Sequence, residues 1–274
     1  MPRGLTDFLP STSGLKFANS FPDGVPVLRL PIPWLGVSIP IGDASHGVCG
    51  GMVYAALDLF LAQPRLEAPP DRLPPPAGSP VTQFVLQRLL DSFTLERVTR
   101  SNAMRYLDFM SVVDHDTWFS RGVGWIVANR EWPAIRSDID QGRPVPLGLV
   151  AGSWVWATDL GAKSKMLGHC HQVLAYGYDL DDAMNLVLRV YDPNDPEDDD
   201  STIETNLANP SRGLTILTPR ITANIEGHQS FRAFFRHTGY APVVPPVGVS
   251  PGPVEPGPQA PETEPSSVPE GSPL

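Results

Sequence analysis

The periodicity of the apolar residues changes about halfway along this chain, and that change constrains the fold more than any other feature. From Gly50 onward, and again in "VTQFVLQRLLDSF" and "RSNAMRYLDFMSVVD", apolar residues recur at helical spacing, as in helices with one buried face. After residue 143 they form short runs rich in Val, Leu and Tyr, such as "HQVLAYGYDL", which are separated by acidic turns. Such runs are typical of antiparallel strands. Helices followed by strands predict an α+β fold.

Proline marks the limits of the folded part, because many of the 32 prolines stand near the two ends of the 274 residues. We expect a Pro-rich extended segment over residues 1–40 that wraps a domain rather than forming its centre. Residues 241–274 contain almost no side chains able to form a core, which predicts a disordered tail. The domain between them spans residues 41–240, with a helical half over 41–142 and a β-rich half over 143–240.

Charge and composition exclude several classes of function. A formal net charge of -10 and a pI near 5.0 argue against nucleic acid as a partner, because such binding depends on Lys and Arg. No run reaches the roughly 18 to 20 apolar residues that span a bilayer, so we expect no membrane insertion. The two cysteines cannot form a disulfide framework. These features predict a cytoplasmic globular protein.

The stretch "DASHGVCGGMVYAALDLF" places Cys49 between a Gly-rich turn and the first predicted helix. The unpaired N–H groups of a helix start carry a partial positive charge, which favours a thiolate. This field contributes only ~0.3 to 1 kcal/mol at an exposed site. An activated thiol therefore needs a cationic partner, and histidine is the obvious one. The alternative is a small buried thiol that packs the helix start.

Two further side chains complete a candidate catalytic set. His171 begins the predicted strand "HQVLAYGYD", and Asp192 ends the next strand in "VYDPND", where a carboxylate can hold the imidazole in its working tautomer. The alternatives are a core histidine and plain turn chemistry for Asp-Pro-Asn. Asn194 is the second candidate for the orienting group, and His169 is expected to be a neutral residue at the loop edge. Nucleophile, base and orienting group then come from three separate elements.

Together these motifs resemble the papain-like cysteine peptidase superfamily. A Gly-rich turn precedes a cysteine at a helix start, and an "H-x-V-x-x-x-G-Y" strand and a strand ending in Asp follow much later. The "YDPN" sequence is closer to bacterial branches related to bacteriocin-processing peptidases, and "DIDQGRPVPLGLV" resembles the helix, "G-[RK]-P-V" and strand that precede histidine there. The resemblance covers residues 40 to 195 and consists of short motifs in the right order.

The resemblance implies a papain-like fold, with the catalytic helix packed on a C-terminal antiparallel sheet. It implies that Cys49 is the nucleophile, His171 the general base and acid, and Asp192 the orienting group. The substrate would be a peptide or an acyl compound, and no cofactor is implied.

One position departs from the family pattern. Papain-like enzymes place an oxyanion-hole Gln six residues before the cysteine, and here Asp43 stands there, an acceptor that would repel an oxyanion. Backbone N–H groups at Cys49, or the side chains of Ser45 or His46, are candidate substitutes. Two functions therefore stay open. One is a thiol hydrolase or acyl transferase acting on an amide or thioester, and the other is a non-catalytic module that uses its cleft for recognition.

The remaining candidate residues concern substrate binding. Asp43, Ser45 and Gly50 at the turn, with Trp154 and Trp156 in "GSWVWATDLG", are candidate substrate-binding residues, although large aromatic residues also belong to cores.

No metal site is predicted. The turn "DPNDPEDDD" has oxygen ligands for Ca²⁺ but lacks the Gly and the final Glu of an EF-hand loop, so we expect a solvated acidic turn. A zinc site would need Cys49 together with His169, Cys170 and His171. Consecutive residues of a strand point to opposite faces, so the last three are poorly placed to bind one tetrahedral ion.

Overall fold

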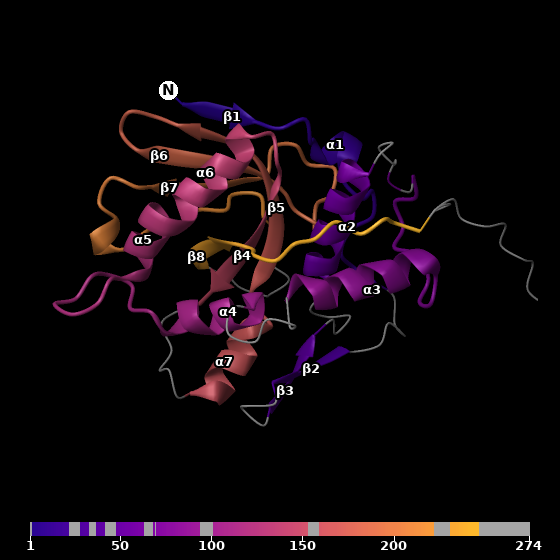
Figure 1. Cartoon of the computed structure of the whole chain (residues 1–274), viewed down its shortest axis with the longest axis horizontal. Helices are drawn as coiled ribbons and strands as arrows, with labels where there is room; N and C mark the ends of the chain where they lie inside the picture. Colours follow the sequence, from indigo (N-terminus) through magenta and orange to yellow (C-terminus); the bar gives the residue numbers. More distant parts are fainter. Residues whose placement is uncertain are drawn as a thin grey trace, which may run out of the picture.

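A six-stranded sheet surrounded by helices forms the fold (Figure 1). The structure, a computed structural model, describes residues 2–21, 28–32, 37–41, 48–62, 68, 70–93, 101–152, 159–221 and 231–246. Every strand pair of the sheet is antiparallel. The α+β fold class expected from the change in periodicity is therefore confirmed.

Strand β5 is the centre of this sheet. The strand order is β7-β6-β5-β4-β8, and β1 pairs with β5 beside this path. Residues 174–180 of β5 pair with β6, while 171–175 pair with β4 and 177–179 pair with β1 along the other edge. The strands are β1 (Arg3–Leu5), β4 (Val145–Ala151), β5 (His171–Leu180), β6 (Asn185–Tyr191), β7 (Thr202–Asn206) and β8 (Phe231–Arg236). A separate hairpin joins β2 (Leu28–Ile32) and β3 (Val37–Ile41).

The N-terminal segment contributes more to the fold than a wrapping chain would. β1 adds a strand to the sheet, and Phe8 packs against Phe60, Tyr176 and Tyr191, with ring centroids 5.3 to 6.1 Å apart. Part of residues 1–40 therefore belongs to the centre of the fold, because the aromatic side chains of Phe8, Phe17 and Phe21 lie in the core.

Some of the helices begin where the sequence supplies a side-chain cap. Ser79 Oγ accepts the N–H of Thr82, and Ser101 Oγ accepts the N–H of Met104, each at 3.2 Å. The helices are α1 (Pro10–Ser13), α2 (Cys49–Leu61), α3 (Pro80–Ser92), α4 (Asn102–Ser111), α5 (Val123–Ile126), α6 (Trp132–Asp140) and α7 (Leu160–Leu167), with a π-helical turn, Val127–Glu131, between α5 and α6. None of the helices in the described ranges is long and apolar enough to cross a membrane.

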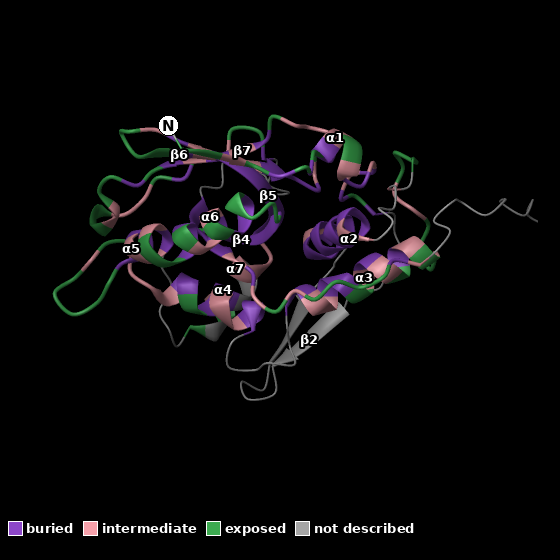
Figure 2. Ribbon diagram, turned by 45° about the horizontal axis from the view of Figure 1, so that its top comes forward, coloured by how far each residue is buried: buried purple, intermediate pink, exposed green. Residues whose placement is uncertain are grey.

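Helix α2 is buried between β5 and α3, and Figure 2 shows it almost wholly in the colour of buried residues. Two glycines permit this position. A Cβ on Gly51 would lie 2.1 Å from the carbonyl oxygen of Val85 in α3, and one on Gly50 would lie 2.4 Å from Gln172 Oε1 in β5. Because glycine has no Cβ, the first turn of α2 packs closer to α3 and β5 than it could with any other residue at these two positions.

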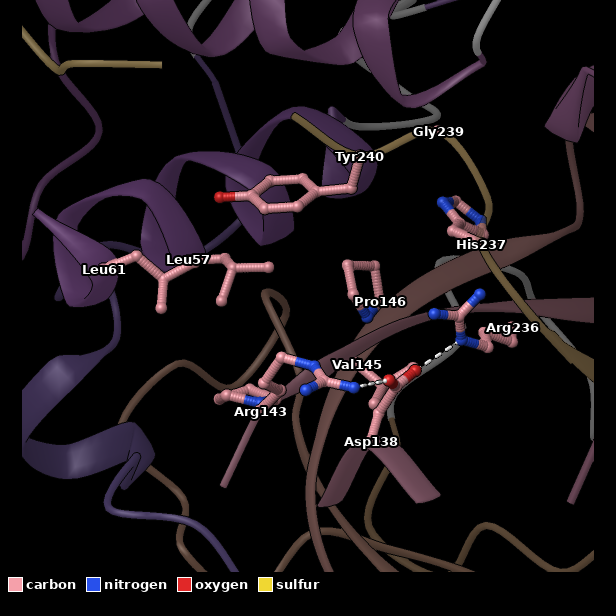
Figure 3. Close-up of a pocket in the computed structure, with 11 residues that line it drawn as sticks. Leu57, Leu61, Asp138, Arg143, Val145, Pro146, Arg236, His237, Gly239 and Tyr240 are labelled. Atoms are coloured by element: carbon pink, nitrogen blue, oxygen red, sulfur yellow. Dashed lines mark hydrogen bonds and ion pairs between the residues drawn. The ribbon is translucent and has the colours of Figure 1, made fainter. Parts of the chain in front are cut away.

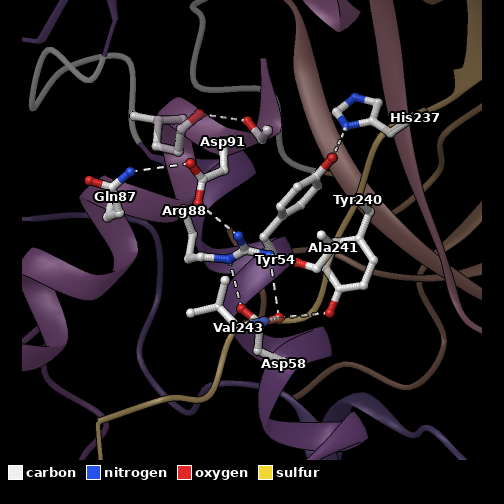
Figure 4. Close-up of polar contacts among 11 residues, drawn as sticks. Tyr54, Asp58, Gln87, Arg88, Asp91, His237, Tyr240, Ala241 and Val243 are labelled. Atoms are coloured by element: carbon white, nitrogen blue, oxygen red, sulfur yellow. Dashed lines mark hydrogen bonds and ion pairs between the residues drawn. The ribbon is translucent and has the colours of Figure 1, made fainter. Parts of the chain in front are cut away.

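A buried ion pair ties the C-terminal segment to α2 and α3 (Figure 4). Arg88 Nε lies 2.7 Å from Asp58 Oδ2, and both side chains are almost fully buried. Tyr240 Oη donates to Asp58 at 2.7 Å, the N–H of Val243 donates at 3.1 Å, and Arg88 donates to the carbonyl of Ala241 at 3.0 Å. The described fold therefore continues to residue 246, inside the stretch that the sequence assigns to the tail. Residues 247–274 lie outside the described residues.

Candidate active site

Cys49 is the first residue of α2, where the sequence places the helix start. The preceding Val48 provides no side-chain cap, and the N–H groups of Cys49 and Gly50 form no hydrogen bond with another described residue. The half-buried thiol therefore lies beside backbone donors and the positive end of the helix dipole.

His171 and Asp192 meet because β5 and β6 are antiparallel neighbours. Leu174 pairs with Tyr191, so the end of β6 lies beside the start of β5. His171 Nε2 is 2.7 Å from Asp192 Oδ1, and the two residues are 6% and 0% exposed. The carboxylate of Asp192 and the imidazole of His171 therefore lie in direct contact.

The Cys49 side chain lies close enough to His171 to act on the charge of its ring. Nε2 of the ring is engaged by Asp192, which leaves Nδ1 as the nitrogen available to the thiol. Burial by itself would lower the pKa of His171, but the charge and hydrogen bond of Asp192, together with the contact of Cys49, outweigh burial and raise the pKa from 6.5 to about 10. The ring is therefore an imidazolium at neutral pH, which is the cation that a thiolate requires.

The turn after β6 holds the carboxylate of Asp192 in place. Asp192 Oδ1 accepts both His171 Nε2 and the backbone N–H of Asn194, the latter at 2.9 Å. Asp-Pro-Asn thus forms a turn, and its first residue, Asp192, contacts the ring with its carboxylate. The role of Asn194 next to it is to donate its backbone N–H.

Tyr106 and Gln172 surround the start of β5. Tyr106 Oη donates to the carbonyl of His171 at 3.1 Å, which fixes the strand backbone at the site. The side chain of Gln172 packs on Gly50, and its Oε1 is buried without a hydrogen-bond partner among the described residues.

The second cysteine has a different environment from the first. Burial raises the pKa of Cys170 to about 12, and negative charge at Cys49 adds to this increase. His169 lies just before it, in the turn that leads from α7 to β5, and is half-buried. A thiol of such high pKa is unreactive near neutral pH.

Several expected substrate-binding residues cannot be compared with the geometry. Asp43, Ser45 and His46 lie outside the described residues, and so do Trp154 and Trp156. Gly50 is described, and it supplies one of the two helix-start N–H groups next to the thiol.

No group of His, Cys, Asp or Glu side chains that could hold a metal ion occurs within the described ranges. The carboxylates of the acidic turn after β6 form hydrogen bonds and ion pairs with other protein groups. Asp199 accepts the N–H and Oγ of Ser11 at 2.9 and 2.6 Å, and Asp198 accepts Ser201 Oγ at 3.0 Å and pairs with Arg220 at 2.9 Å. This turn therefore binds protein groups from other segments.

A separate hollow lies at the other end of α2 (Figure 3). Its volume is about 260 Å³, and it is bordered by Leu57 and Leu61 of α2. Arg143 and Arg236 both contact the carboxylate of Asp138 in its wall. At about 1.5 Å per residue, these leucines stand roughly 12 to 18 Å along the helix from Cys49. The hollow is thus distinct from the Cys49 site.

Sequence reasoning missed Asn19, which lies in the Pro-rich N-terminal segment. Its side chain accepts the N–H of Val48 and donates to Asn194, so it touches the neighbours of two proposed catalytic residues. The only signal in the sequence is a polar residue between the aromatic residues Phe17 and Phe21, which are both buried.

Comparisons with protein-family models, with curated proteins and with solved structures found no match to this chain.

Proposed function

We propose that this protein is a papain-like thiol hydrolase or acyl transferase that cleaves an amide or thioester bond through Cys49, His171 and Asp192. The observation that supports this proposal is a buried imidazole that contacts the Asp192 carboxylate through Nε2, and whose pKa is raised against burial by that carboxylate and by the Cys49 side chain. Three segments far apart in the chain converge there, as the order of the motifs predicts.

In the first half of the reaction the Cys49 thiolate attacks the carbonyl carbon of the substrate. The carbonyl oxygen becomes an oxyanion, and the N–H groups of Cys49 and Gly50 are positioned at the helix start to donate to it. His171 then gives its Nδ1 proton to the leaving nitrogen or sulfur, the scissile bond breaks, and an acyl thioester remains on Cys49.

In the second half the neutral imidazole accepts a proton from the incoming nucleophile. A water molecule gives hydrolysis, and an amine or thiol gives acyl transfer. Attack on the thioester releases the acyl product and restores the Cys49 thiolate beside the imidazolium. Asp192 keeps the ring in one tautomer throughout and stabilises its positive charge.

The second candidate function is a non-catalytic papain-like binding module. Asp43 in place of the oxyanion-hole Gln favours it, because a carboxylate there opposes negative charge on the substrate oxygen. Asp43→Gln separates the two candidates. Turnover of any member of a broad acyl panel by the parent or the variant supports an enzyme, whereas no turnover by either supports a binding module.

Alkylation by iodoacetamide tests the activated thiol directly. At about pH 6 a free thiol of pKa ~8.5 is almost wholly protonated and reacts slowly. We expect Cys49 to be alkylated much faster than a model thiol, while Cys170 in the same molecule stays unmodified. His171→Ala should bring the Cys49 rate down to that of the model thiol. A parent Cys49 that reacts no faster than the model thiol would refute the proposal.

A further inference from the structure

The N-terminal segment is fastened to the turn that carries Asp192. Ser11 donates twice to Asp199, and the backbone N–H of Asn19 donates to the carbonyl of Pro193 at 2.9 Å. The side chain of Asn19 then donates from Nδ2 to Asn194 Oδ1 at 3.0 Å. Three residues of this turn are thus bound by a segment that lies more than 170 positions earlier in the chain.

The same Asn19 side chain also reaches the start of α2. Its Oδ1 accepts the backbone N–H of Val48 at 2.7 Å, and Val48 is the residue directly before Cys49. Asn19 is 5% exposed, so water does not readily replace these bonds. Both ends of one buried amide are therefore occupied by neighbours of proposed catalytic residues.

A continuous set of hydrogen bonds results. It runs from Val48 through Asn19 to Asn194, whose backbone N–H donates to the Asp192 carboxylate that holds His171. The set joins the nucleophile's helix to the orienting carboxylate by a route that does not pass through the sheet. The start of α2 and the Asp192 turn are thereby held together beside Cys49 and His171.

We propose that Asn19 is a positioning residue that sets the start of α2 against the Asp192 turn and thereby fixes the distance between the Cys49 sulfur and the His171 ring. This role builds on the thiol chemistry proposed above. Asn19 touches neither reacting atom and acts through Val48 on one side and Asn194 on the other. The N-terminal segment then belongs to the active site.

The chemistry requires such a link, because thiol and imidazole come from different layers. Cys49 is carried by a helix and His171 by a strand, and small shifts between the two change a hydrogen bond steeply. A misplacement of about 1 Å at a reacting group lowers rates by up to 10²-fold. An amide that bonds both layers restricts such shifts.

The test compares three full-length variants with the parent. Asn19→Ala removes both side-chain bonds. Asn19→Asp keeps an acceptor for the Val48 N–H, and the amide of Asn194 can turn to donate to the new carboxylate. Asn102→Ala is the matched control, because Asn102 is also buried and its side chain joins Ser92 to Thr238.

Two readouts are measured on each variant, namely the rate of Cys49 alkylation at about pH 6 and the pKa of His171 by NMR. We expect Asn19→Ala to lower the alkylation rate by roughly 10- to 100-fold and to lower the pKa of His171, because the ring loses its fixed partners. Asn19→Asp should recover part of the alkylation rate and part of the pKa of His171. Asn102→Ala should lower the melting temperature without changing either.

Parent values of both readouts in Asn19→Ala would overturn the positioning role, and so would an equal loss in Asn102→Ala. The two proposals fail in different ways. If the parent Cys49 itself is unreactive, the thiol chemistry is refuted, while the His171 titration still decides whether Asn19 positions the ring.

Discussion

Two buried carboxylates, Asp58 within α2 and Asp192 at the end of β6, differ in the cation that each one pairs with. Asp58 pairs with Arg88, a cation that keeps its charge at any ordinary pH, and it also accepts from Tyr240 and Val243 (Figure 4). Asp192 pairs with His171, a cation that can release its proton to a substrate. The first arrangement fixes the C-terminal segment, and the second can carry a reaction.

The difference lies in the partner more than in burial, since both carboxylates are almost fully enclosed. Asp58 Oδ1 accepts from Arg88, Tyr240 and Val243, and Arg88 Nε lies 2.7 Å from its Oδ2. Asp192 Oδ1 accepts from His171 and from the backbone N–H of Asn194, and no cationic side chain other than His171 pairs with Asp192 among the residues that the structure describes. Asp192 thus directs its charge at a single titratable ring. Changes at Asp58 should therefore alter stability, and changes at Asp192 should alter chemistry.

The largest effect is expected for Cys49→Ala. Removing the nucleophile should lower turnover of any acyl substrate by roughly 10⁴- to 10⁶-fold, as for other enzymes with a nucleophile and a base. The melting temperature should change little, because the side chain is small and half-buried. Single-turnover assays and calorimetry on the same preparation check both parts. Retained turnover would place the reaction elsewhere in the molecule.

Asp192→Asn should have the next largest effect on activity. The amide keeps the shape of the carboxylate but loses its charge, so the pKa of His171 should fall and turnover should drop by about 10³- to 10⁴-fold. Asp58→Asn is the matched change at the other carboxylate, and it should leave turnover of the folded protein near the parent value. Equal losses of turnover in Asp192→Asn and Asp58→Asn would contradict the proposed distinction between a catalytic and a structural carboxylate.

Asp58→Ala should instead produce the largest loss of stability. It removes the buried carboxylate from the Arg88 guanidinium, which keeps Asp91, a partly exposed residue, as an ion-pair partner. Breaking a buried pair costs about 3 to 5 kcal/mol in the free energy of unfolding. Asp58→Leu combined with Arg88→Met should be less destabilised than Asp58→Ala alone, because no charge is then left buried. Urea denaturation of the three proteins measures this. A change below about 1 kcal/mol in Asp58→Ala would show that the pair is not structural.

The pH dependence of stability should follow the His171 site. Its pKa is raised in the folded protein, so the stabilisation it provides is fully present below the unfolded value of 6.5 and is lost as pH rises through about 10. The stability difference between the parent and His171→Gln should therefore shrink across this range. Denaturation at a series of pH values measures it, and a constant difference would contradict the raised pKa.

The smallest effect is expected for an exposed pair. Arg72 and Glu197 lie 2.9 Å apart with 78% and 36% of their side chains exposed. Arg72→Ala should change the free energy of unfolding by about 0 to 1 kcal/mol, and salt should reduce even that. A larger loss would mean that exposure is a poor guide to these pairs.

The sequence predicted the parts of the site that depend on local pattern. Helical spacing after Gly50 located the start of α2, and Val- and Tyr-rich runs located the beginning of β5 and the end of β6. Antiparallel pairing then brings His171 next to Asp192 without further information. Their proposed catalytic roles remain predictions.

Other features depend on contacts across the chain that no local pattern encodes. Asn19 sits in a Pro-rich stretch without periodicity, and its partners lie 29 and 175 positions away. Strand β1 is only three residues long, too short to show alternation. Asp58 did carry a signal, because an acid inside the apolar run "AALDLFL" predicts a buried partner.

An NMR titration of His171 tests most directly the idea that thiol, imidazole and carboxylate act as one unit. The account predicts a ring that is protonated at neutral pH with a pKa near 10 in the parent, and a pKa that falls toward 6.5 in Asp192→Asn. A parent ring that titrates near 6.5, unaffected by Asp192→Asn, would contradict it.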